Sequence, residues 1–392
     1  MFKKLFVFLA CLGTIFCAHA QVVVSKFAEG RNPTIYCNGI SGNQEFSSRF
    51  VSNLKNCGWF DISSTPSADY VADGTASGST ATINLRDGAG NPKLSFSVPL
   101  SGTPTKNADS AVDYLLKKIF NVEICSSKIA FSVETGTGIK EIYYCDFDGS
   151  NIVRATNNKT LSVEADWYPG KSSIIYTMYS KMSTDIVEYD TLTRRSRRLC
   201  QFPGLNSCAA ISPNGKFMAI ILSRDNQVEL YIKEVETRAM RRLTTSKSVE
   251  ASPCWSPDGT RICYVSDASG RPALYIIPAG GGASTRLPTV GSEAATPAWS
   301  KDNKIAYSAK MGRNYAIAVL DLSGKTQSGL VVDAAGDWEN PSWAPDNRHV
   351  VCSRSYGGKS TLFVIDTQTK KMRQLINSNF NMSFPAWSGL FK

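Results

Sequence analysis

The stretch ASPCWSPDGT, residues 251–260, returns in modified form as TPAWS (296–300), NPSWAPDN (340–347) and FPAWS (384–388). Each of its tryptophans lies 44 residues before the next, and counting back by 44 twice more reaches an isoleucine and then another tryptophan. The positions in this register are Trp167, Ile211, Trp255, Trp299, Trp343 and Trp387. A fixed step of about 40–50 residues is typical of one supersecondary unit that buries its apolar faces against its neighbours.

Each unit is predicted to contain four short strands. In the unit of Trp255, the turn residues SPDG are followed by apolar runs at 262–265 and 273–277 and by a shorter piece at 285–287. Such a unit fits a propeller blade, and continuous apolar runs suit sheets that are covered on both faces. A second marker recurs nearly in step, at the expected ends of the third strands: Asp146, Asp190, Glu234, Pro278, Asp321 and Asp366. The sequence therefore predicts a six-bladed all-β propeller.

The two ends of the array indicate how the ring closes. The array opens on a second-strand segment, Lys128–Ser132, and closes on a first-strand segment, Phe384–Trp387. We expect the last strand to complete the blade that begins at Lys128, because this pairing leaves no open sheet edge. The propeller domain is therefore assigned to residues 127–392.

The first 20 residues are typical of a signal peptide. A basic start at 1–4 is followed by an apolar run at 5–17, too short to span a bilayer, and by Ala-His-Ala at 18–20. This pattern predicts cleavage after Ala20 and an exported protein. A lipoprotein anchored through Cys11 or Cys17 fits less well, because Cys11 would leave a very short apolar region.

Residues 21–126 do not share the repeat and are predicted to form a small α/β domain. Apolar residues at helical spacing predict one helix from Asn43 to Gly58 and another from Asn107 to Phe120. Short strands are expected at 21–24, 59–62 and 69–72, with a hairpin that pairs 81–85 with 93–98.

The chain is basic, with a net charge of +10 that falls to +8 without Lys3 and Lys4. The densest basic run, 194–198, is repeated one unit later by Arg238, Arg241 and Arg242, between the third and fourth strands at the outer edge of a blade. Charges that protect an edge strand are one explanation. Binding to an anionic lipid or polymer surface is the other, whereas export argues against nucleic acid.

Without Cys11 and Cys17 the chain keeps nine cysteines, an odd number, so at least one thiol is unpaired. Cys254 and Cys263 flank one hairpin turn and could form a cross-strand disulfide, but such bridges are usually strained. Buried free cysteines that act as small hydrophobes are the favoured interpretation.

The sequence contains no recognisable set of catalytic residues. His349 is the single histidine after the signal peptide, lies in an expected strand, and has no G-x-S-x-G motif to serve. One histidine is too few for a histidine-based zinc site. Gly280–Gly282 lacks the Lys-Ser/Thr of a phosphate-binding loop and reads as a hairpin turn. We therefore expect a protein that is not an enzyme and holds no cofactor or metal.

The remaining candidate site is a surface. Residues that enter the innermost strands line the mouth of a propeller channel, and here they are small or acidic. They could be ordinary solvated loops, or a docking rim for a protein or peptide. The candidate partner-binding residues are Leu205, Asn206, Ser207, Cys208, Glu250, Ala251, Ser252, Glu293, Ala294, Ala295, Glu339 and Asn340.

With these residues laid out, the chain resembles the TolB family, periplasmic components of the Tol–Pal cell-envelope system. The resemblance runs from about Val22 to Lys392, and its strongest parts are the PxWSPDG repeats and the final FPAWS. The junction LLKKIF (115–120) followed by KIAF (128–131) is also similar, as are SNLKNCGWF (52–60) and ADYVADG (68–74). Many propeller proteins share the repeat, whereas the combination of this repeat with the N-terminal α/β domain is specific to the TolB family.

The resemblance implies an α/β domain, a six-bladed propeller, a periplasmic location and no enzyme activity. It further implies that the propeller binds the peptidoglycan-associated lipoprotein Pal, and that an N-terminal strand contacts the inner-membrane protein TolA by joining its sheet edge. That strand corresponds to Gln21, Val22, Val23 and Val24. The family's Pal-contacting stretch corresponds to 202–211 and, one unit later, 250–252.

Two positions depart from the family pattern, since Leu205 stands where TolB proteins can carry a histidine and Cys208 where a small Ala is found. We expect a monomeric envelope scaffold that supports outer-membrane integrity and cell division. The alternative is a propeller hydrolase or carbohydrate-binding protein with a small ligand in its channel, for which the innermost strands offer mainly Ala, Ser, Pro and Trp.

Overall fold

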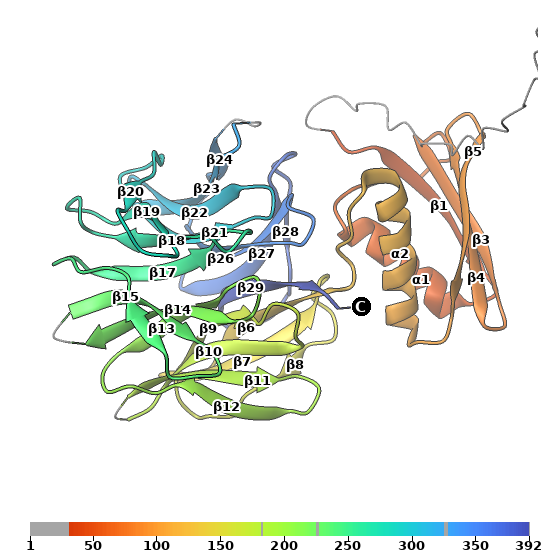
Figure 1. Cartoon of the computed structure of the whole chain (residues 1–392). Coiled ribbons are helices and arrows are strands. Elements are labelled where there is room, and N and C mark those ends of the chain that lie inside the picture. The colour runs from red at the N-terminus through yellow and green to blue at the C-terminus, as the bar shows by residue number, and fades with distance from the viewer. Residues whose placement is uncertain (1–30, 182, 225–226, 325–327, 392) are drawn as a thin grey trace, which may run out of the picture.

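The computed structural model describes residues 31–181, 183–224, 227–324 and 328–391 (Figure 1). The predicted signal peptide and the predicted strand at 21–24 lie outside these residues. Two domains follow one another along the chain, a small mixed sheet with two helices and a larger propeller. No helix in the described ranges combines the length and the apolar character needed to cross a bilayer.

Six four-stranded antiparallel sheets form the propeller, which confirms the predicted number of blades. The first strand of each repeat is the innermost, and successive innermost strands contact one another around the ring. These strands are β9 (Ser162–Trp167), β13 (Asn206–Ile211), β17 (Glu250–Trp255), β21 (Ala294–Trp299), β25 (Asp337–Trp343) and β29 (Met382–Leu390).

Three further strands complete each blade, running outward from the channel in chain order. The second strands are β6 (Ser127–Gly136), β10 (Ser173–Tyr179), β14 (Phe217–Arg224), β18 (Arg261–Ser266), β22 (Lys304–Met311) and β26 (His349–Tyr356). The third strands are β7 (Ile139–Asp146), β11 (Thr184–Asp190), β15 (Gln227–Glu234), β19 (Ala273–Pro278), β23 (Asn314–Asp321) and β27 (Lys359–Asp366). The outermost strands are β8 (Val153–Arg154), β12 (Arg195–Cys200), β16 (Met240–Arg242), β20 (Thr285–Arg286), β24 (Gly329–Val332) and β28 (Met372–Gln374).

The ring closes as the sequence predicts. The C-terminal strand β29 pairs antiparallel with β6, with Ala386 opposite Ala130 and Trp387 opposite Ile129. The first blade is thus built from both ends of the propeller sequence, and no innermost strand is left with an open edge.

Local chemistry explains why each repeat turns where it does. In the turn between β17 and β18, Ser256 Oγ donates to Asp258 at 2.6 Å, and Gly259 takes the left-handed conformation at φ 69° that the turn requires. The second repeat marker also has a local role, because all its residues are the last residues of third strands. The Asp190 carboxylate, for example, accepts the backbone N–H of Leu192 at 2.8 Å and so caps the turn that follows.

The repeated tryptophan joins neighbouring blades. Trp255 Nε1 donates to the carbonyl of Ala210 at 2.9 Å, and Trp343 Nε1 donates to the carbonyl of Ala298 at 3.0 Å. In both cases the acceptor lies 45 residues back, on the innermost strand of the preceding blade. The repeat step therefore fixes a contact between blades as well as the fold of each one.

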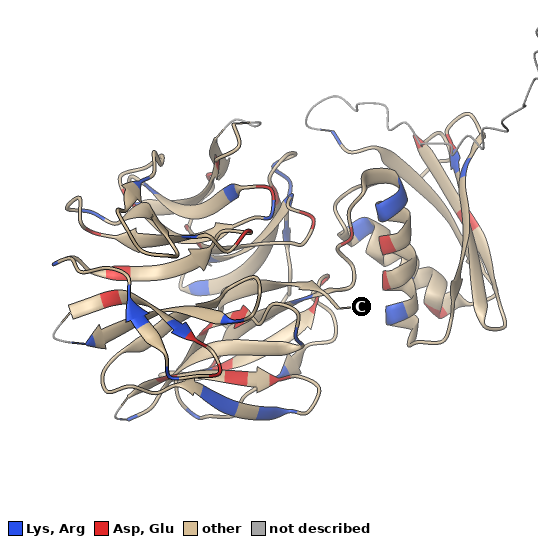
Figure 2. Ribbon diagram, viewed as in Figure 1, with Lys and Arg blue, Asp and Glu red and all other residues tan. Residues whose placement is uncertain are grey.

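The basic run predicted between the third and fourth strands lies largely within the outermost strand β12, where it appears as a blue band (Figure 2). Arg197 pairs with Glu188 at 2.6 Å, and Arg198 with Asp185 at 2.9 Å. The same third-to-fourth-strand ion pair recurs in the neighbouring blades as Arg154 with Glu141 and Arg242 with Glu229. These pairs support the first explanation of the run, in which charged residues fasten and protect an edge strand.

The N-terminal domain has a five-stranded mixed sheet with α1 and α2 on the face toward the propeller (Figure 1). The sheet order is β2-β1-β3-β4-β5, with β1 parallel to both β2 and β3. Its elements are β1 (Thr34–Ser41), α1 (Gln44–Asn56), β2 (Asp61–Ile62), β3 (Tyr70–Ser77), β4 (Thr80–Asp87), β5 (Pro92–Pro99) and α2 (Pro104–Phe120).

The predicted helices are present with small differences in their bounds. Asn43 caps α1 through its side chain, and Gly58 follows the helix with a left-handed φ of 75°. Helix α2 begins three residues earlier than predicted, because Thr103 accepts the N–H of Lys106 and Pro104 fits the first turn. The strand predicted at 59–62 is correct only for Asp61–Ile62.

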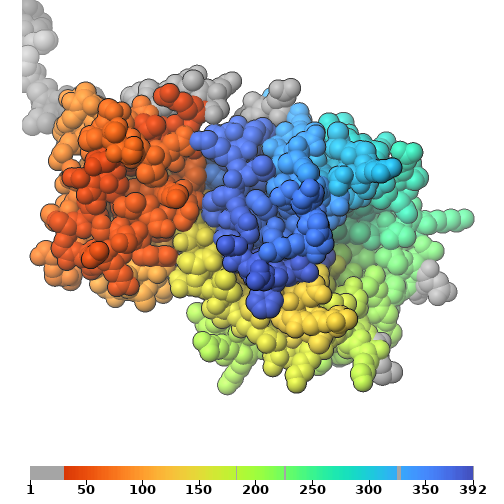
Figure 3. All heavy atoms as spheres, turned by 180° about the vertical axis from the view of Figure 1, so that it is seen from behind, coloured from red at the N-terminus to blue at the C-terminus, as the bar shows by residue number. Residues whose placement is uncertain are grey.

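One hydrophobic core runs from the N-terminal domain into the propeller. It contains Phe60 and Leu54 from the first domain together with Val351, Leu362 and Trp387 from blades six and one. In the space-filling view the red and orange atoms of the N-terminal domain lie directly against the blue and yellow atoms of these blades (Figure 3). The contact between the domains is therefore an extended packed surface.

Replacing Trp387 with alanine tests the closure of the ring. Trp387 is 6% exposed and its Nε1 donates to Ser127 Oγ at 2.8 Å, across the pairing that joins the two ends of the propeller. We expect Trp387→Ala to lower the free energy of unfolding by about 3–5 kcal/mol, measured by thermal and denaturant unfolding. Phe380→Ala is the matched control, because Phe380 is 60% exposed. Equal stability of the two variants would contradict this role.

Candidate partner-binding site

The propeller encloses an open channel of about 810 Å³ that is lined by residues from all six innermost strands. These strands all start at the same end of the channel, which is the mouth that the sequence predicts. The second strands end there too, because each is antiparallel to its innermost neighbour. The loops that enter innermost strands and the turns after second strands therefore form one surface.

Six residues with a left-handed backbone conformation form a ring along the channel, called the left-handed ring below. Each innermost strand contains one non-glycine residue with φ between 46° and 56°, and these residues are spaced by 44: Glu164, Cys208, Ser252, Thr296, Asn340 and Phe384. All six line the channel, and at each one the pairing with the second strand shifts register, as at a β-bulge. A left-handed backbone is unfavourable for such residues and is found mostly where a strand is bent to present a side chain.

The structure divides the predicted mouth residues into two groups. Asn206, Ser207, Glu250 and Ala294 are buried inside the blades, where they hold the loops that form the mouth. The others are half-buried, and among them Cys208, Ser252 and Asn340 line the channel. The remaining half-buried residues do not line the channel, and they are Leu205, Ala251, Glu293, Ala295 and Glu339. The strand at Gln21–Val24 is outside the described residues.

Three members of the left-handed ring were not predicted from the sequence: Glu164, Thr296 and Phe384. A signal was available, since counting 44 residues in either direction from Cys208, Ser252 or Asn340 reaches all of them. Nothing in a single segment marks these residues, because a left-handed conformation is not expected of Glu, Thr or Phe.

Glu164 fixes the ring between blades two and three. Its Oε2 accepts the backbone N–H of Cys208 at 2.8 Å, and its Oε1 lies 3.3 Å from the Cys208 sulfur, which donates. Burial, together with the charge of Glu164, raises the pKa of Cys208 to about 12. The cysteine is therefore a thiol at neutral pH and not an activated nucleophile.

Glu250 supports the mouth from inside. Its Oε1 accepts hydrogen bonds from Ser246 at 2.9 Å and from Ser266 at 3.2 Å, whereas its Oε2 is buried without a hydrogen-bond partner among the described residues. Burial raises the pKa of this carboxyl group to about 7, and the neighbouring Glu229 adds to the shift. Glu250 is thus a buried acid that titrates near neutral pH.

A second hollow of about 570 Å³ lies beside the channel between blades six and one. Its lining includes Glu134, Asp337 and Glu339, together with Asn340 and Phe384 of the left-handed ring. Burial, aided by the charge of Asp337, raises the pKa of Glu339. Lys140 and Lys359 also line this hollow, so the mouth carries charges of both signs on this side.

Apolar side chains are exposed around the same end of the propeller. Val249 and Val290 lie in loops that enter innermost strands, and Met311 and Tyr356 are the last residues of second strands. Exposed apolar groups that surround a concave surface are typical of a protein-binding site. The arrangement can hold an apolar or aromatic side chain of a partner, with hydrogen-bonding groups nearby.

The other candidate groups lie elsewhere or are structural. All nine cysteines in the described part of the chain are free thiols, including Cys254 and Cys263, which face each other across β17 and β18. His349 is buried where blade six meets the N-terminal domain, away from the channel lining. No cluster of three or more metal-binding side chains is found in the residues that the structure describes.

Residues 121–391 match the family model of the TolB β-propeller domain. The chain belongs to the TolB β-propeller family. A crystal structure of TolB from Acinetobacter baumannii has the same two-domain fold, with a TM-score of 0.83 over 92% of this chain and 98% of that chain. The sequence identity in that comparison is 23%, so the likeness concerns the fold.

Curated TolB relatives match over shorter segments. The Tol-Pal system protein TolB of Desulfosudis oleivorans is 34% identical over 110 residues, which cover 28% of this chain and 24% of that protein. The TolB homolog of Chlamydia trachomatis is 29% identical over 161 residues, which cover 38% of this chain and 37% of that protein. The matched segments thus span well under half the length of these relatives. The family assigned from the sequence is confirmed, whereas the residues of the binding site are not tested by these matches.

The buried carboxyl group of Glu250 predicts a pH-dependent stability. Because its folded-state pKa is raised above the ordinary value of 4.5, the native state binds the proton more tightly than the unfolded state, and stability falls as the pH rises through about 4.5 to 7. The variant Glu250→Gln stays neutral at every pH. We expect it to match the wild type near pH 4 and to be more stable by about 1–3 kcal/mol near pH 8, measured by denaturant unfolding.

Glu45, in the exposed first turn of α1, provides the control. We expect Glu45→Gln to change stability by less than about 0.5 kcal/mol at either pH. A Glu250→Gln variant that is less stable than the wild type near pH 8 would show that the carboxylate is held by favourable contacts instead.

Proposed function

We propose that this protein is a non-enzymatic scaffold of a Tol–Pal-type system in the periplasm. The mouth of the propeller binds a peptidoglycan-associated lipoprotein, and the segment Gln21–Val24 adds a strand to an inner-membrane partner of the TolA type. Through these two contacts the protein supports outer-membrane integrity and cell division. It acts as a monomer, exported by the signal peptide at residues 1–20.

One observation carries the proposal: the channel mouth combines a sixfold ring of left-handed residues with exposed apolar side chains. Val249, Val290, Met311 and Tyr356 expose apolar side chains at this end of the propeller, where a docked partner would cover them. The left-handed ring holds its side chains on rigid strands, which lowers the entropic cost of binding. Cys208 is a thiol, and both carboxylate oxygens of Glu164 are occupied by Cys208. These two observations favour a binding site over a catalytic one.

The family membership supports the same proposal, because the curated relatives include proteins named for the Tol–Pal system. A channel that binds a small ligand remains the competing proposal, and its volume of about 810 Å³ is large enough for one. A pull-down from cell envelopes separates the two. Recovery of a peptidoglycan-binding lipoprotein supports the scaffold, whereas tight sugar binding without any lipoprotein supports the ligand channel.

Val249→Arg tests the mouth. Val249 is 54% exposed in the loop before β17, so an arginine there leaves the blade intact but obstructs a docked protein with a large charged side chain. We expect at least about a tenfold loss of affinity for the soluble domain of the organism's own peptidoglycan-associated lipoprotein, measured by calorimetry. Leu192→Arg is the matched control, because Leu192 is 79% exposed at the outer edge of blade two. Equal affinities would remove this loop from the interface.

Removal of residues 21–24 tests the second contact. We expect the shortened protein, otherwise mature, to keep its affinity for the lipoprotein and to lose binding to the C-terminal domain of the TolA-type partner, since strand addition needs the backbone of this segment. Surface plasmon resonance with both partners measures the two affinities on one sample. Undiminished binding to the inner-membrane partner would contradict the assignment.

A further inference from the structure

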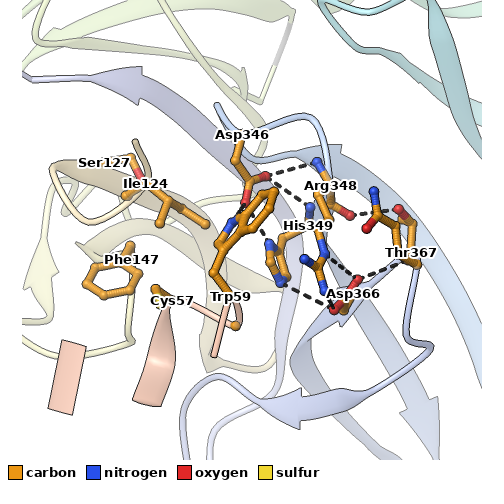
Figure 4. Close-up of polar contacts among 12 residues, drawn as sticks. Cys57, Trp59, Ile124, Ser127, Phe147, Asp346, Arg348, His349, Asp366 and Thr367 are labelled. Atoms are coloured by element: carbon orange, nitrogen blue, oxygen red, sulfur yellow. Dashed lines mark hydrogen bonds and ion pairs between the residues drawn. The ribbon is translucent and has the colours of Figure 1, made fainter. Parts of the chain in front are cut away.

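The joint between blade six and the N-terminal domain contains a buried charged cluster (Figure 4). Blade six contributes Asp346, Arg348, His349 and Asp366, all of which are buried. They lie at the edge of the blade that packs against the segment following α1 of the N-terminal domain (Figure 4). None of these groups lines the channel, so the cluster has no part in the proposed binding site.

His349 lies between two carboxylates. Its Nδ1 is 2.6 Å from Asp346 Oδ2, and its Nε2 is 3.9 Å from Asp366 Oδ2. The imidazole is 3% exposed, and Nε2 has no hydrogen-bond partner among the described residues. A neutral ring that donates through Nδ1 would leave a bare lone pair at Nε2, directed at a carboxylate. A protonated ring would present an N–H there instead.

The charge count of the cluster also favours the protonated ring. Arg348 is already engaged by Asp366, with its Nε 2.9 Å from Oδ1 and a second nitrogen 2.5 Å from Oδ2. That ion pair leaves the carboxylate of Asp346 to be balanced. With an imidazolium at His349 the four groups sum to zero, whereas with a neutral imidazole one negative charge is buried without a counterion, which is costly.

Both carboxylates remain ionised over the relevant pH range. Burial alone would raise the pKa of Asp366, but the hydrogen bonds from Arg348 and the charge of His349 hold it at about 2. In the same way, His349 and backbone N–H groups outweigh burial at Asp346 and lower the pKa of that carboxyl group. Of the side-chain types in the cluster, histidine is the one that ordinarily changes charge near neutral pH.

Lys370 lies near Asp366, with which it interacts electrostatically, but no ion pair of a lysine with Asp346 is found among the described residues. Lys371 is bound to Asp61 of the N-terminal domain at 2.6 Å. Lys370 follows the turn after β27, and its ammonium donates to the carbonyl of Leu330 at 3.2 Å. On the opposite side, burial raises the pKa of Cys57 to about 12, so this residue stays an uncharged thiol.

The same cluster holds the N-terminal domain in place. Asp346 Oδ2, which faces His349, also accepts Trp59 Nε1–H at 2.9 Å. Arg348 lies 4.5 Å from the centre of the Trp59 ring and donates to Asn32 Oδ1 at 2.5 Å. A side chain in place of Gly58 would put its Cβ 2.3 Å from His349 Nε2, so the imidazole is in close contact with the backbone of the other domain.

We propose that His349 is a proton-controlled latch between the two domains. In the imidazolium form the cluster is neutral, and Asp346 and Arg348 are held in position to bind Trp59 and Asn32. When the ring loses its proton as the pH rises, a net negative charge remains in the joint, water enters to solvate it, and the contact of the N-terminal domain with blade six loosens. The inference concerns this joint and does not depend on the proposed partners.

Histidine-selective NMR tests the protonation directly. The chain contains only two histidines, His19 and His349, and the first lies in the predicted signal peptide. The mature protein labelled with ¹⁵N-histidine should therefore give one imidazole, which we expect to be protonated at about pH 5.5 and to lose its proton by about pH 9. A ring that is neutral throughout this range, or that never titrates, would overturn the latch.

Hydrogen exchange of the mature protein tests the mechanical consequence. After correction for the intrinsic pH dependence of exchange, we expect the protection of a peptide covering residues 57–63 to fall at least about tenfold with the same midpoint as the imidazole. A peptide covering β18, in a blade remote from the joint, should keep its protection. Loss of protection in both peptides, or in neither, would contradict the proposal.

Two variants separate the latch from simple packing. His349→Gln can still donate to Asp346 but cannot carry charge, so the corrected protection of 57–63 should no longer depend on pH. Trp59→Phe removes one contact of Asp346 and leaves the imidazole, so protection should be lower but should keep its pH midpoint. If His349→Gln does not fold, the wild-type protein provides the test. The latch then requires that the pH midpoint of the imidazole and the pH midpoint of the protection of 57–63 agree. A pH-dependent His349→Gln or a pH-independent Trp59→Phe would count against the latch.

Discussion

A hydrogen bond from the repeated tryptophan crosses to the preceding blade at three of the six joints between blades. Trp255 and Trp343 donate their indole N–H to a carbonyl on the preceding innermost strand, and Trp167 does the same to Ala386 at 3.1 Å, across the closed seam. A backbone carbonyl near the channel can seldom be left unpaired, so this bond sets how closely two blades approach. Ile211 lacks the donor, and there blades two and three are joined by apolar packing and by the hydrogen bond from the Cys208 N–H to Glu164.

Much of this architecture could be predicted from the sequence because the repeat determines both turn positions and pairing partners. The number of blades, the closing strand β29 and the ends of the third strands all follow from one 44-residue register. The N-terminal domain has no repeat and was predicted less well. Strand β1, TIYCNGIS, was not predicted because it contains Asn and Gly and shows no regular alternation. The predicted strand at 59–62 was too long because Trp59 and Phe60 instead pack in the joint between the domains.

The candidate site could be located but not detailed from the sequence. The mouth follows from the direction of the innermost strands, yet burial of Asn206 and Glu250 depends on loops that fold back onto them. The joint between the domains was beyond sequence reasoning, because Trp59 and Asn32 meet their partners 287 and 316 residues away. The isolation of His349 in the sequence predicted a structural residue, and its carboxylate neighbours are brought together only by the turn before β26 and the end of β27.

The seam between β29 and β6 has a consequence for the order of events during biosynthesis. The blade that begins the propeller receives its innermost strand from residues 382–390, which are synthesised after all the other described strands. Blade one is therefore incomplete, with its channel-side edge unpaired, until the other five blades have been synthesised. A chain that stopped short would present this edge together with the apolar faces of blades one and six. One missing strand thus leaves the ring open at its seam.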